Sequence, residues 1–291
     1  MATLYFNGAV DSDWATLGNW WEDDAFTVPA TSLPTSGDSV IASADIWGNS
    51  SGSAPTLVDF TMNAGVLGIP ITVTGNAIFN GNAIVNFCTI TGNATFNDYS
   101  YNYSGTVSGD ATCNDYSLND CYVSGDATFN DYSCNGGWYG NGRVFGHATF
   151  NDSSVNNASG YGGQCDTATF NGGSYNKGTV FGLAVFNDYS YSDFIQAGPY
   201  RADLQGDAVF NGFAYNTGPI AGNATFNDDS YHQGASVVGS GNWWQQQVVV
   251  TGNISGTATF RNRAVNKSAV TGTIVLAYGK GINGSSILGV I

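Results

Sequence analysis

The chain has 291 residues, of which only 10% are charged, with 7 Lys and Arg against 22 Asp and Glu. The resulting net charge of −15 disfavours binding to nucleic acids or anionic membranes, because both need a basic surface. With 40 Gly, 14% aromatic residues and one glutamate, the composition excludes a helical protein and argues against disorder.

Residues 1–55 do not follow the repeat that comes after them. They carry four of the seven tryptophans, Trp14, Trp20, Trp21 and Trp47. We expect no secretory signal, since the start is neither basic nor apolar, and no membrane span, since no run of about 18 apolar residues exists. A stack of repeats needs covered ends. The segment is therefore predicted to be a Trp-rich N-terminal cap, with attachment to a larger assembly as the alternative.

Residues 56–276 repeat a seven-residue pattern, V-x-G-x-A-x-F. Alternation with a period of two predicts a strand whose Val, Gly, Ala and Phe positions face inward. The aromatic position mostly recurs every 16 or 17 residues and is occupied by Phe79, Phe96, Cys113, Phe129, Phe150, Phe170, Phe186, Phe210, Phe226, Trp243, Phe260 and Leu276. A second column after each turn (Tyr101, Leu118, Cys134, Val155, Tyr175, Tyr191, Tyr215, Tyr231, Val265) is also expected to face inward.

This spacing predicts an all-β fold, a single-stranded β-solenoid (β-helix) of about 12 coils in which equivalent side chains stack on one another. At a strand spacing of about 4.8 Å, the coils would form a rod roughly 60 Å long. Residues 277–291 would form a C-terminal cap or tail, whose apolar end is either a last strand or a self-association contact.

The turn after each Phe carries two polar columns. Its Asn positions are expected to form an amide ladder: Asn97, Asn114, Asn130, Asn151, Asn171, Asn187, Asn211 and Asn227. Its Asp positions are Asp98, Asp115, Asp131, Asp152, Asp188 and Asp228. We expect each carboxylate to accept backbone N–H bonds of its turn, with a column of Ca²⁺ as the alternative and no other cofactor.

Few residues offer catalytic chemistry. The five cysteines are odd in number and form no CxxC pair, so reduced, apolar thiols are expected. His147 is expected to be solvated and His232 to lie in a turn, about five coils away, which excludes a shared metal or catalytic site. No catalytic motif is present, so the sequence predicts no catalytic residue, no metal site and no enzyme.

Three insertions share one phase of the repeat: 135–143, 156–163 and 192–203. Loops on a rigid scaffold are common recognition sites. The candidate ligand-binding residues are the aromatic side chains of these loops, Trp138, Tyr139, Tyr161, Phe194 and Tyr200. Such rings can stack on sugars or contact proteins, although they could instead fold back onto the edge of the solenoid.

The repeats G-N-A-T-F-N-D-Y-S (92–100) and G-D-A-T-F-N-D-Y-S (125–133) resemble those of β-solenoid proteins of bacteriophage tail fibres or virion surfaces. Similar repeats occur in bacterial surface adhesins. The opening Gly18–Trp21, with Pro34 and Asp38–Ile41, is similar to the segment that often precedes such solenoids. The resemblance implies a fibre or adhesin and transfers no catalytic residue.

The sequence thus favours a non-enzymatic structural or adhesive protein of the virion surface, assembled in the cytoplasm without a signal peptide. Its expected partners are host-surface polysaccharide, virion proteins or further copies of itself in a homo-oligomer. A bacterial surface adhesin or extracellular filament subunit is the alternative, and a polysaccharide depolymerase comes third.

Overall fold

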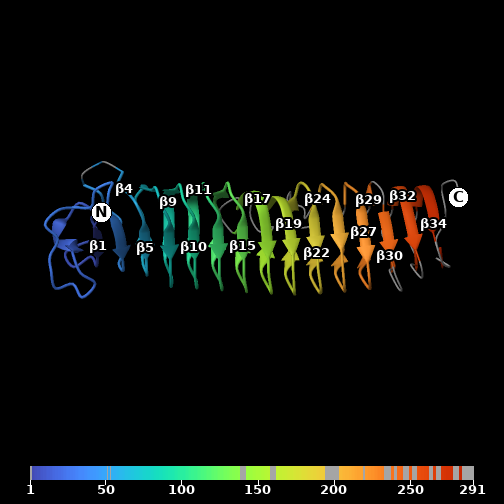
Figure 1. Ribbon diagram of the computed structural model, residues 1–291, viewed down its shortest axis with the longest axis horizontal. Helices are drawn as coiled ribbons and strands as arrows, with labels where there is room; N and C mark the ends of the chain where they lie inside the picture. Colours follow the sequence, from blue (N-terminus) through green and yellow to red (C-terminus); the bar gives the residue numbers. More distant parts are fainter. Residues whose placement is uncertain are drawn as a thin grey trace. The chain divides into compact units, whose positions relative to one another are not determined.

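The computed structural model describes residues 2–50, 52, 54–137, 142–157, 162–193, 203–218 and 220–232, and further on 237–238, 241–244, 249–250, 254–261, 265–266, 270–277 and 282–283. The chain forms two compact units, Met1–Gly146 and His147–Ile291. Both are β-solenoids built from coils of about 17 residues, which confirms the predicted fold class. Figure 1 shows the strands of successive coils side by side within each unit.

Most described coils contain three short strand segments, two of which run together in some coils. The Phe strand ends near the predicted aromatic position, the turn strand follows the Asn-Asp turn, and the Val strand ends at the predicted Val position. In the first unit the Phe strands are β5 (Phe60–Met62), β8 (Ala77–Phe79), β10 (Ala94–Phe96), β12 (Ala111–Cys113) and β15 (Ala127–Phe129). The turn strands are β6 (Val66–Leu67), β13 (Leu118–Asn119) and β16 (Cys134–Asn135). The Val strands are β4 (Thr56–Leu57), β7 (Ile71–Val73) and β14 (Tyr122–Val123), while β9 (Ile84–Ile90) and β11 (Tyr101–Val107) join a turn strand to a Val strand.

The second unit contains the same three kinds of strand. Its Phe strands are β22 (Ala184–Phe186), β25 (Ala208–Phe210), β27 (Ala224–Asn227) and β30 (Gly241–Trp244). Its turn strands are β18 (Val155–Asn156), β20 (Tyr175–Asn176), β23 (Tyr191–Ser192), β26 (Tyr215–Asn216), β28 (Tyr231–His232), β31 (Val249–Val250), β33 (Val265–Asn266) and β35 (Ile282–Asn283). Its Val strands are β21 (Thr179–Val180), β24 (Asp203–Leu204) and β29 (Val237–Val238). Val and Phe strands are continuous in β19 (Gln164–Phe170), β32 (Ile254–Arg261) and β34 (Val270–Ala277), and also in β17 (Arg143–Phe150), whose residues up to Gly146 belong to the first unit.

Parallel, in-register pairing places each apolar residue against its equivalent in the next coil. Phe96 pairs with Phe79, and their rings stack at 5.0 Å with an interplanar angle of 10°. Phe170 and Phe186 stack at 4.6 Å. Up to Phe226, the Phe, Ala and Val columns are fully or almost fully buried, as predicted. The strand register extends the aromatic position through Trp243 to Leu276.

The seven-residue strand that the pattern predicts is broken in most coils at its glycine. In the coil that holds Gly109, the Val strand ends at Val107 and the Phe strand begins at Ala111, with a bend between them. A Cβ at Gly109 would lie 2.6 Å from the carbonyl oxygen of Gly92 in the preceding coil. The glycine is therefore needed for close approach of two backbones at a corner, and its role is not to fill the inner face.

The second predicted core column is wrong by one residue. Tyr175 and Tyr191 are only partly buried, and their rings stack on the outer side at 5.0 Å. The buried side chains belong to the next residue, which is polar: Asn102, Asn119, Asn135, Asn156, Asn176, Ser192 and Asn216. These amides satisfy one another along the stack, as in the bond from Asn156 Nδ2 to Asn176 Oδ1 (2.8 Å). A hydrogen-bonded amide can be buried without the penalty that an unpaired polar group carries.

The predicted amide ladder of the turn is confirmed, and in the first unit it begins earlier, at Asn63 and Asn80. In every described step the amide Nδ2 donates to Oδ1 of the preceding coil, at 2.7–3.0 Å. All of these amides therefore point in the same direction within each unit.

Coils differ in length mainly at one corner, between the turn strand and the Val strand. Two residues occupy it in the 16-residue coil (120–121), and three do so in the 17-residue coil before it (103–105). All three insertions start at this corner, because they follow β16, β18 and β23. The predicted common phase of the insertions is thus a single corner of the coil.

The N-terminal segment is joined to the first coils by backbone pairing. β1 (Thr3–Phe6) pairs in parallel with β3 (Ser39–Ala42), which pairs with β5, and β2 (Trp20–Trp21) runs antiparallel to β1. Phe6, Trp14 and Trp20 are buried and form edge-to-face ring contacts. Among the described residues the helical structure is one 3₁₀ turn, Leu17–Asn19, and none of them forms a helix that could span a membrane.

Aspartates pin the loops of this N-terminal segment. Hydrogen bonds lower the pKa of Asp11, Asp13, Asp23 and Asp38, the largest contributions coming from Asn19, Ala15, Thr27 and Thr35, respectively. In Asp23, for example, the carboxylate accepts from the Thr27 hydroxyl at 2.6 Å and from the backbone N–H of Val28 at 2.8 Å.

The first prediction concerns acid. A carboxyl whose pKa is lower in the folded state contributes stability above its ordinary value of 3.8 and loses it as the pH falls through the folded value. We therefore expect residues 2–50 to lose protection from hydrogen exchange, measured against the intrinsic exchange rate at each pH, as the pH falls below 3.8, while the coils around Phe96 stay protected. An equal loss of protection in both regions would contradict this expectation.

The second prediction concerns the stacked rings. Phe96→Ala should lower the free energy of unfolding by about 3–5 kcal/mol, because it leaves a cavity between two coils. Tyr99→Ala, three residues away and exposed, should change it by less than about 0.5 kcal/mol. Urea denaturation followed by circular dichroism measures both values, and similar losses in the two variants would show that burial does not set the energetics.

Candidate functional site

The residues that the sequence proposes for ligand binding, Trp138, Tyr139, Tyr161, Phe194 and Tyr200, all lie outside the described residues. The structure does describe where their loops begin and end. In the second unit, Val155 pairs with Tyr175 and Tyr175 pairs with Tyr191, so β18 and β23 belong to one column. The loops after these two strands therefore start at the same corner, and three coils form their common base.

The bases of these loops are held by buried polar contacts. Asn156 and Ser192, the last residues of β18 and β23, are fully buried. Asn176, between them in the stack, donates from Nδ2 to the carbonyl oxygen of Gly178 at 3.1 Å and to Ser192 Oγ at 3.5 Å. The inner amide column thus fixes the points from which the loops start.

A row of exposed tyrosines runs along the turn of the first unit, and the sequence reasoning missed it. Tyr99, Tyr116 and Tyr132 are 61%, 51% and 57% exposed, and successive rings stack at 5.0 Å with an interplanar angle of 5°. Each of them directly follows an Asp of the turn column. The recurrence of tyrosine directly after the turn Asp, outside the alternating pattern, could have indicated this row from the sequence.

The Asp column owes its residue type chiefly to backbone conformation. Asp98, Asp115 and the other four carboxylates have φ between 57° and 59°, the left-handed region that Asp and Asn tolerate better than most residues. Gly81, Gly172 and Gly212 occupy the same position with φ of 61–65°. Where Gly precedes Asp in the stack, the carboxylate also accepts its N–H, as Asp98 does from Gly81 at 2.9 Å.

Calcium is not needed to explain this column. Among the described residues, no group of three or more His, Cys, Asp or Glu side chains is arranged to hold a metal ion. Backbone conformation is a sufficient reason for each of these residues.

The third prediction separates the two explanations of the column. Asp115→Gly should leave the free energy of unfolding nearly unchanged, whereas Asp115→Ala should lower it by about 1–2 kcal/mol through left-handed strain. Thermal melts of the wild type with Ca²⁺ and with EDTA should coincide. A lower melting temperature in EDTA, together with destabilisation by Asp115→Gly, would establish a calcium column instead.

His147 is not the solvated residue that the sequence suggests. It is partly buried, and its ring nitrogens lie 2.8 Å from Thr167 Oγ1 and 3.0 Å from Thr169 Oγ1 in the next coil. It occupies the position at which Asn or Asp side chains accept the backbone N–H of the following coil, as Asp110 does from Asp126 at 2.9 Å. At this position His147 thus contacts threonine side chains of the next coil, where Asn or Asp would accept a backbone N–H of that coil.

The cysteines are free thiols, as predicted. Cys113 takes the place of a ring in the Phe column, and burial raises its pKa to about 12. Burial has the same effect on Cys88 and also raises the pKa of Cys121. A protonated, buried thiol is a poor nucleophile, so these three residues serve packing.

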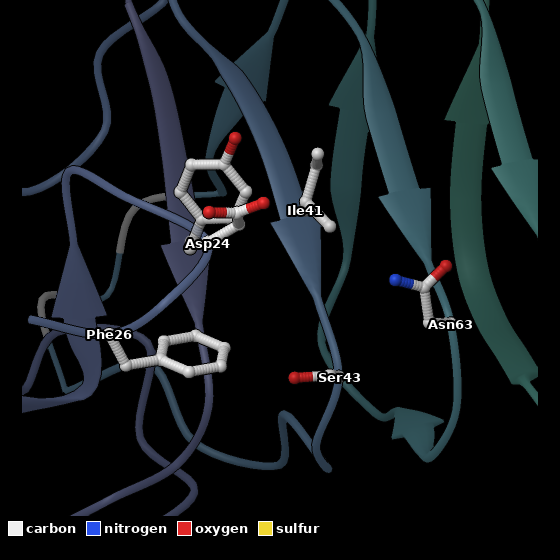
Figure 2. A pocket seen from close by; sticks show the side chains of 6 residues that line it. Asp24, Phe26, Ile41, Ser43 and Asn63 are labelled. Atoms are coloured by element: carbon white, nitrogen blue, oxygen red, sulfur yellow. The ribbon is translucent and has the colours of Figure 1, made fainter.

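A pocket of about 400 Å³ lies on the N-terminal segment and the first coil, lined by Tyr5, Asp24, Phe26, Ile41, Ser43 and Asn63. Tyr5 and Ile41 are paired in register on the outer face of β1 and β3. Figure 2 shows the Phe26 ring directed toward Ser43, and the Asn63 amide on the side of the pocket opposite Phe26. The lining combines two aromatic rings with a carboxylate, a hydroxyl and an amide.

Phe26 is held in an unusual conformation at this pocket. Its φ is 55°, a value that is uncommon for a bulky residue and costs free energy. The Asp23 carboxylate accepts hydrogen bonds from the backbone N–H groups of Thr27 and Val28, which fixes the residues that follow Phe26. The Phe26 ring packs edge-on against Trp21 at 6.2 Å. Strain that is maintained in this way is often associated with a binding site.

The comparisons with known proteins leave the family open. No family model, no curated protein and no solved structure matches the chain.

Proposed function

We propose that this protein is a non-enzymatic structural and adhesive component of a virion surface, in which the solenoid is a rigid scaffold for loops that contact host-surface glycans. The observation that carries the proposal is the common corner of the insertions. In the second unit, two loops with aromatic residues start from one column of buried, hydrogen-bonded side chains.

A scaffold of this kind suits adhesion because its stiffness does not depend on the loops. Backbone pairing, ring stacking and amide ladders continue from coil to coil whether the corner holds two residues or ten. Sequence change in the loops can therefore alter recognition without altering the fold. The resemblance of the repeats to those of phage fibres supports a virion rather than a bacterial cell surface as the place of action.

The fourth prediction tests the loops. Trp138→Ala and Tyr200→Ala should each weaken binding to an immobilised panel of purified bacterial surface polysaccharides by about tenfold or more, as expected for aromatic contact residues. Their melting temperatures should stay near the wild-type value, and Tyr116→Ala, an exposed aromatic of the turn row, is the matched control. Unchanged binding in both loop variants would overturn the proposed recognition edge.

Two further measurements test the rest of the proposal. Mass spectrometry of purified virions should detect the protein, and its absence there would contradict a virion role. Incubation with the bound polysaccharide should release no reducing sugar, whereas steady release would identify a depolymerase.

A further inference from the structure

The pocket of the N-terminal segment lies at the end of an amide ladder. Asn63 is the first rung, and its Oδ1 accepts from Asn80 Nδ2 at 3.0 Å. Four further rungs follow in the same direction, Asn80, Asn97, Asn114 and Asn130. Among the residues that the structure describes, none accepts a hydrogen bond from Asn63 Nδ2. Figure 2 shows this nitrogen directed toward the side of the pocket formed by Ile41 and Ser43.

Because all amides of the ladder point the same way, its end at Asn63 differs in charge from its other end. Each amide donates toward the N-terminal coil, so the amide dipoles add and leave a positive, donating end at Asn63. Hydrogen bonds in a chain polarise one another, which strengthens the terminal donor. The effect is the side-chain counterpart of a helix end, and it favours a ligand oxygen next to Asn63.

On another side of the pocket, Asp24 supplies the complementary group. Its carboxylate is exposed, and no described residue donates a hydrogen bond to it. A ligand with hydroxyl groups can donate to this carboxylate and accept from the amide at the same time. Phe26, Tyr5 and Ile41 add apolar surface to the lining of the same pocket.

The polar and apolar groups that line the pocket favour one chemical class of ligand over others. An anion is disfavoured by Asp24 and by the net charge of −15. A simple ammonium ion would meet the carboxylate and the rings but has no acceptor for the Asn63 amide. A sugar unit has an apolar ring face as well as hydroxyl donors and acceptors, and a pocket of about 400 Å³ lies within the usual range for small ligands of about 300–1,000 Å³.

We propose that this pocket binds a neutral sugar unit, with its ring face against Phe26 and Tyr5, one oxygen accepting from Asn63, and one hydroxyl donating to Asp24. The site is independent of the loop residues to which adhesion is assigned above. It uses residues of the N-terminal segment and the first coil alone.

Saturation-transfer NMR with the methyl glycosides of glucose, galactose, mannose, N-acetylglucosamine and N-acetylgalactosamine tests the proposal on the full chain. At least one glycoside should bind, with its ring-face protons receiving the strongest transfer. Tetramethylammonium is the competing probe. Binding of none of the five glycosides, or of tetramethylammonium alone, would overturn the assignment.

Asn63→Asp is the decisive variant, because it keeps an oxygen that accepts from Asn80 and removes the free donor. It should weaken glycoside binding by about tenfold, the loss expected for one hydrogen bond and an added repulsion. Asn82→Asp, which adds the same charge at an exposed turn position outside the pocket, should leave affinity within about twofold and corrects for net charge.

Phe26→Gly separates binding from folding. Glycine adopts a φ of 55° without strain, which offsets the lost ring contact with Trp21, so the melting temperature should stay near that of the wild type while glycoside binding falls by at least about tenfold. Wild-type affinity in both Asn63→Asp and Phe26→Gly would place the sugar elsewhere and overturn the proposal. Trp138→Ala, in a loop, should leave binding of the glycoside in this pocket unchanged.

Discussion

Every side chain in these coils has to pack against a copy of its own position. Parallel, in-register pairing imposes this condition, because it sets residue on residue at the spacing of adjacent strands. Aromatic and aliphatic side chains satisfy it by stacking, as Phe186 and Phe210 do at 4.7 Å. Among polar groups, the amide satisfies it best, since it donates and accepts along the same line.

The same condition explains where charge is found. Two carboxylates about 5 Å apart repel by roughly 0.8 kcal/mol in water and by several times more in the interior. The Asp column accordingly lies on the outer turn, where solvent screens it, while the buried column is Asn and Ser. Six of the 22 acidic residues of the chain occupy this one turn position, which needs a left-handed backbone and recurs in coil after coil.

Much of the fold could be predicted because the residues that form each type of contact recur at the same position in coil after coil. The period of two identified the Phe, Ala and Val columns, and the recurring Asn-Asp pair identified the turn. The buried Asn119 and Asn176 could not be found in this way, because an asparagine reads as polar unless its register with another asparagine is known. The break at Gly109 was hidden too, since close backbone approach depends on the neighbouring coil.

The pocket was beyond sequence reasoning for a different reason. Its residues come from four separate stretches of the chain, three of which precede the repeat, so no pattern connects Tyr5, Phe26 and Asn63. The strained φ of Phe26 has no signature in the sequence either. The aromatic residues of the loops, by contrast, were identified from the sequence, because the insertions share one position in the repeat. They lie outside the residues that the structure describes.

The length of the peptide at the corner between the turn strand and the Val strand can change without changing how the coils stack. In the second unit, Tyr175 and Tyr215 lie on either side of Tyr191 in one continuous ring stack, although the corner after β20 is short and the corner after β23 holds the longest insertion. Peptides of different length can therefore be exchanged at this corner over evolutionary time, or grafted there by design, while the reading frame of the stack is preserved. The number of coils therefore sets how many corners of this kind are available for such insertions.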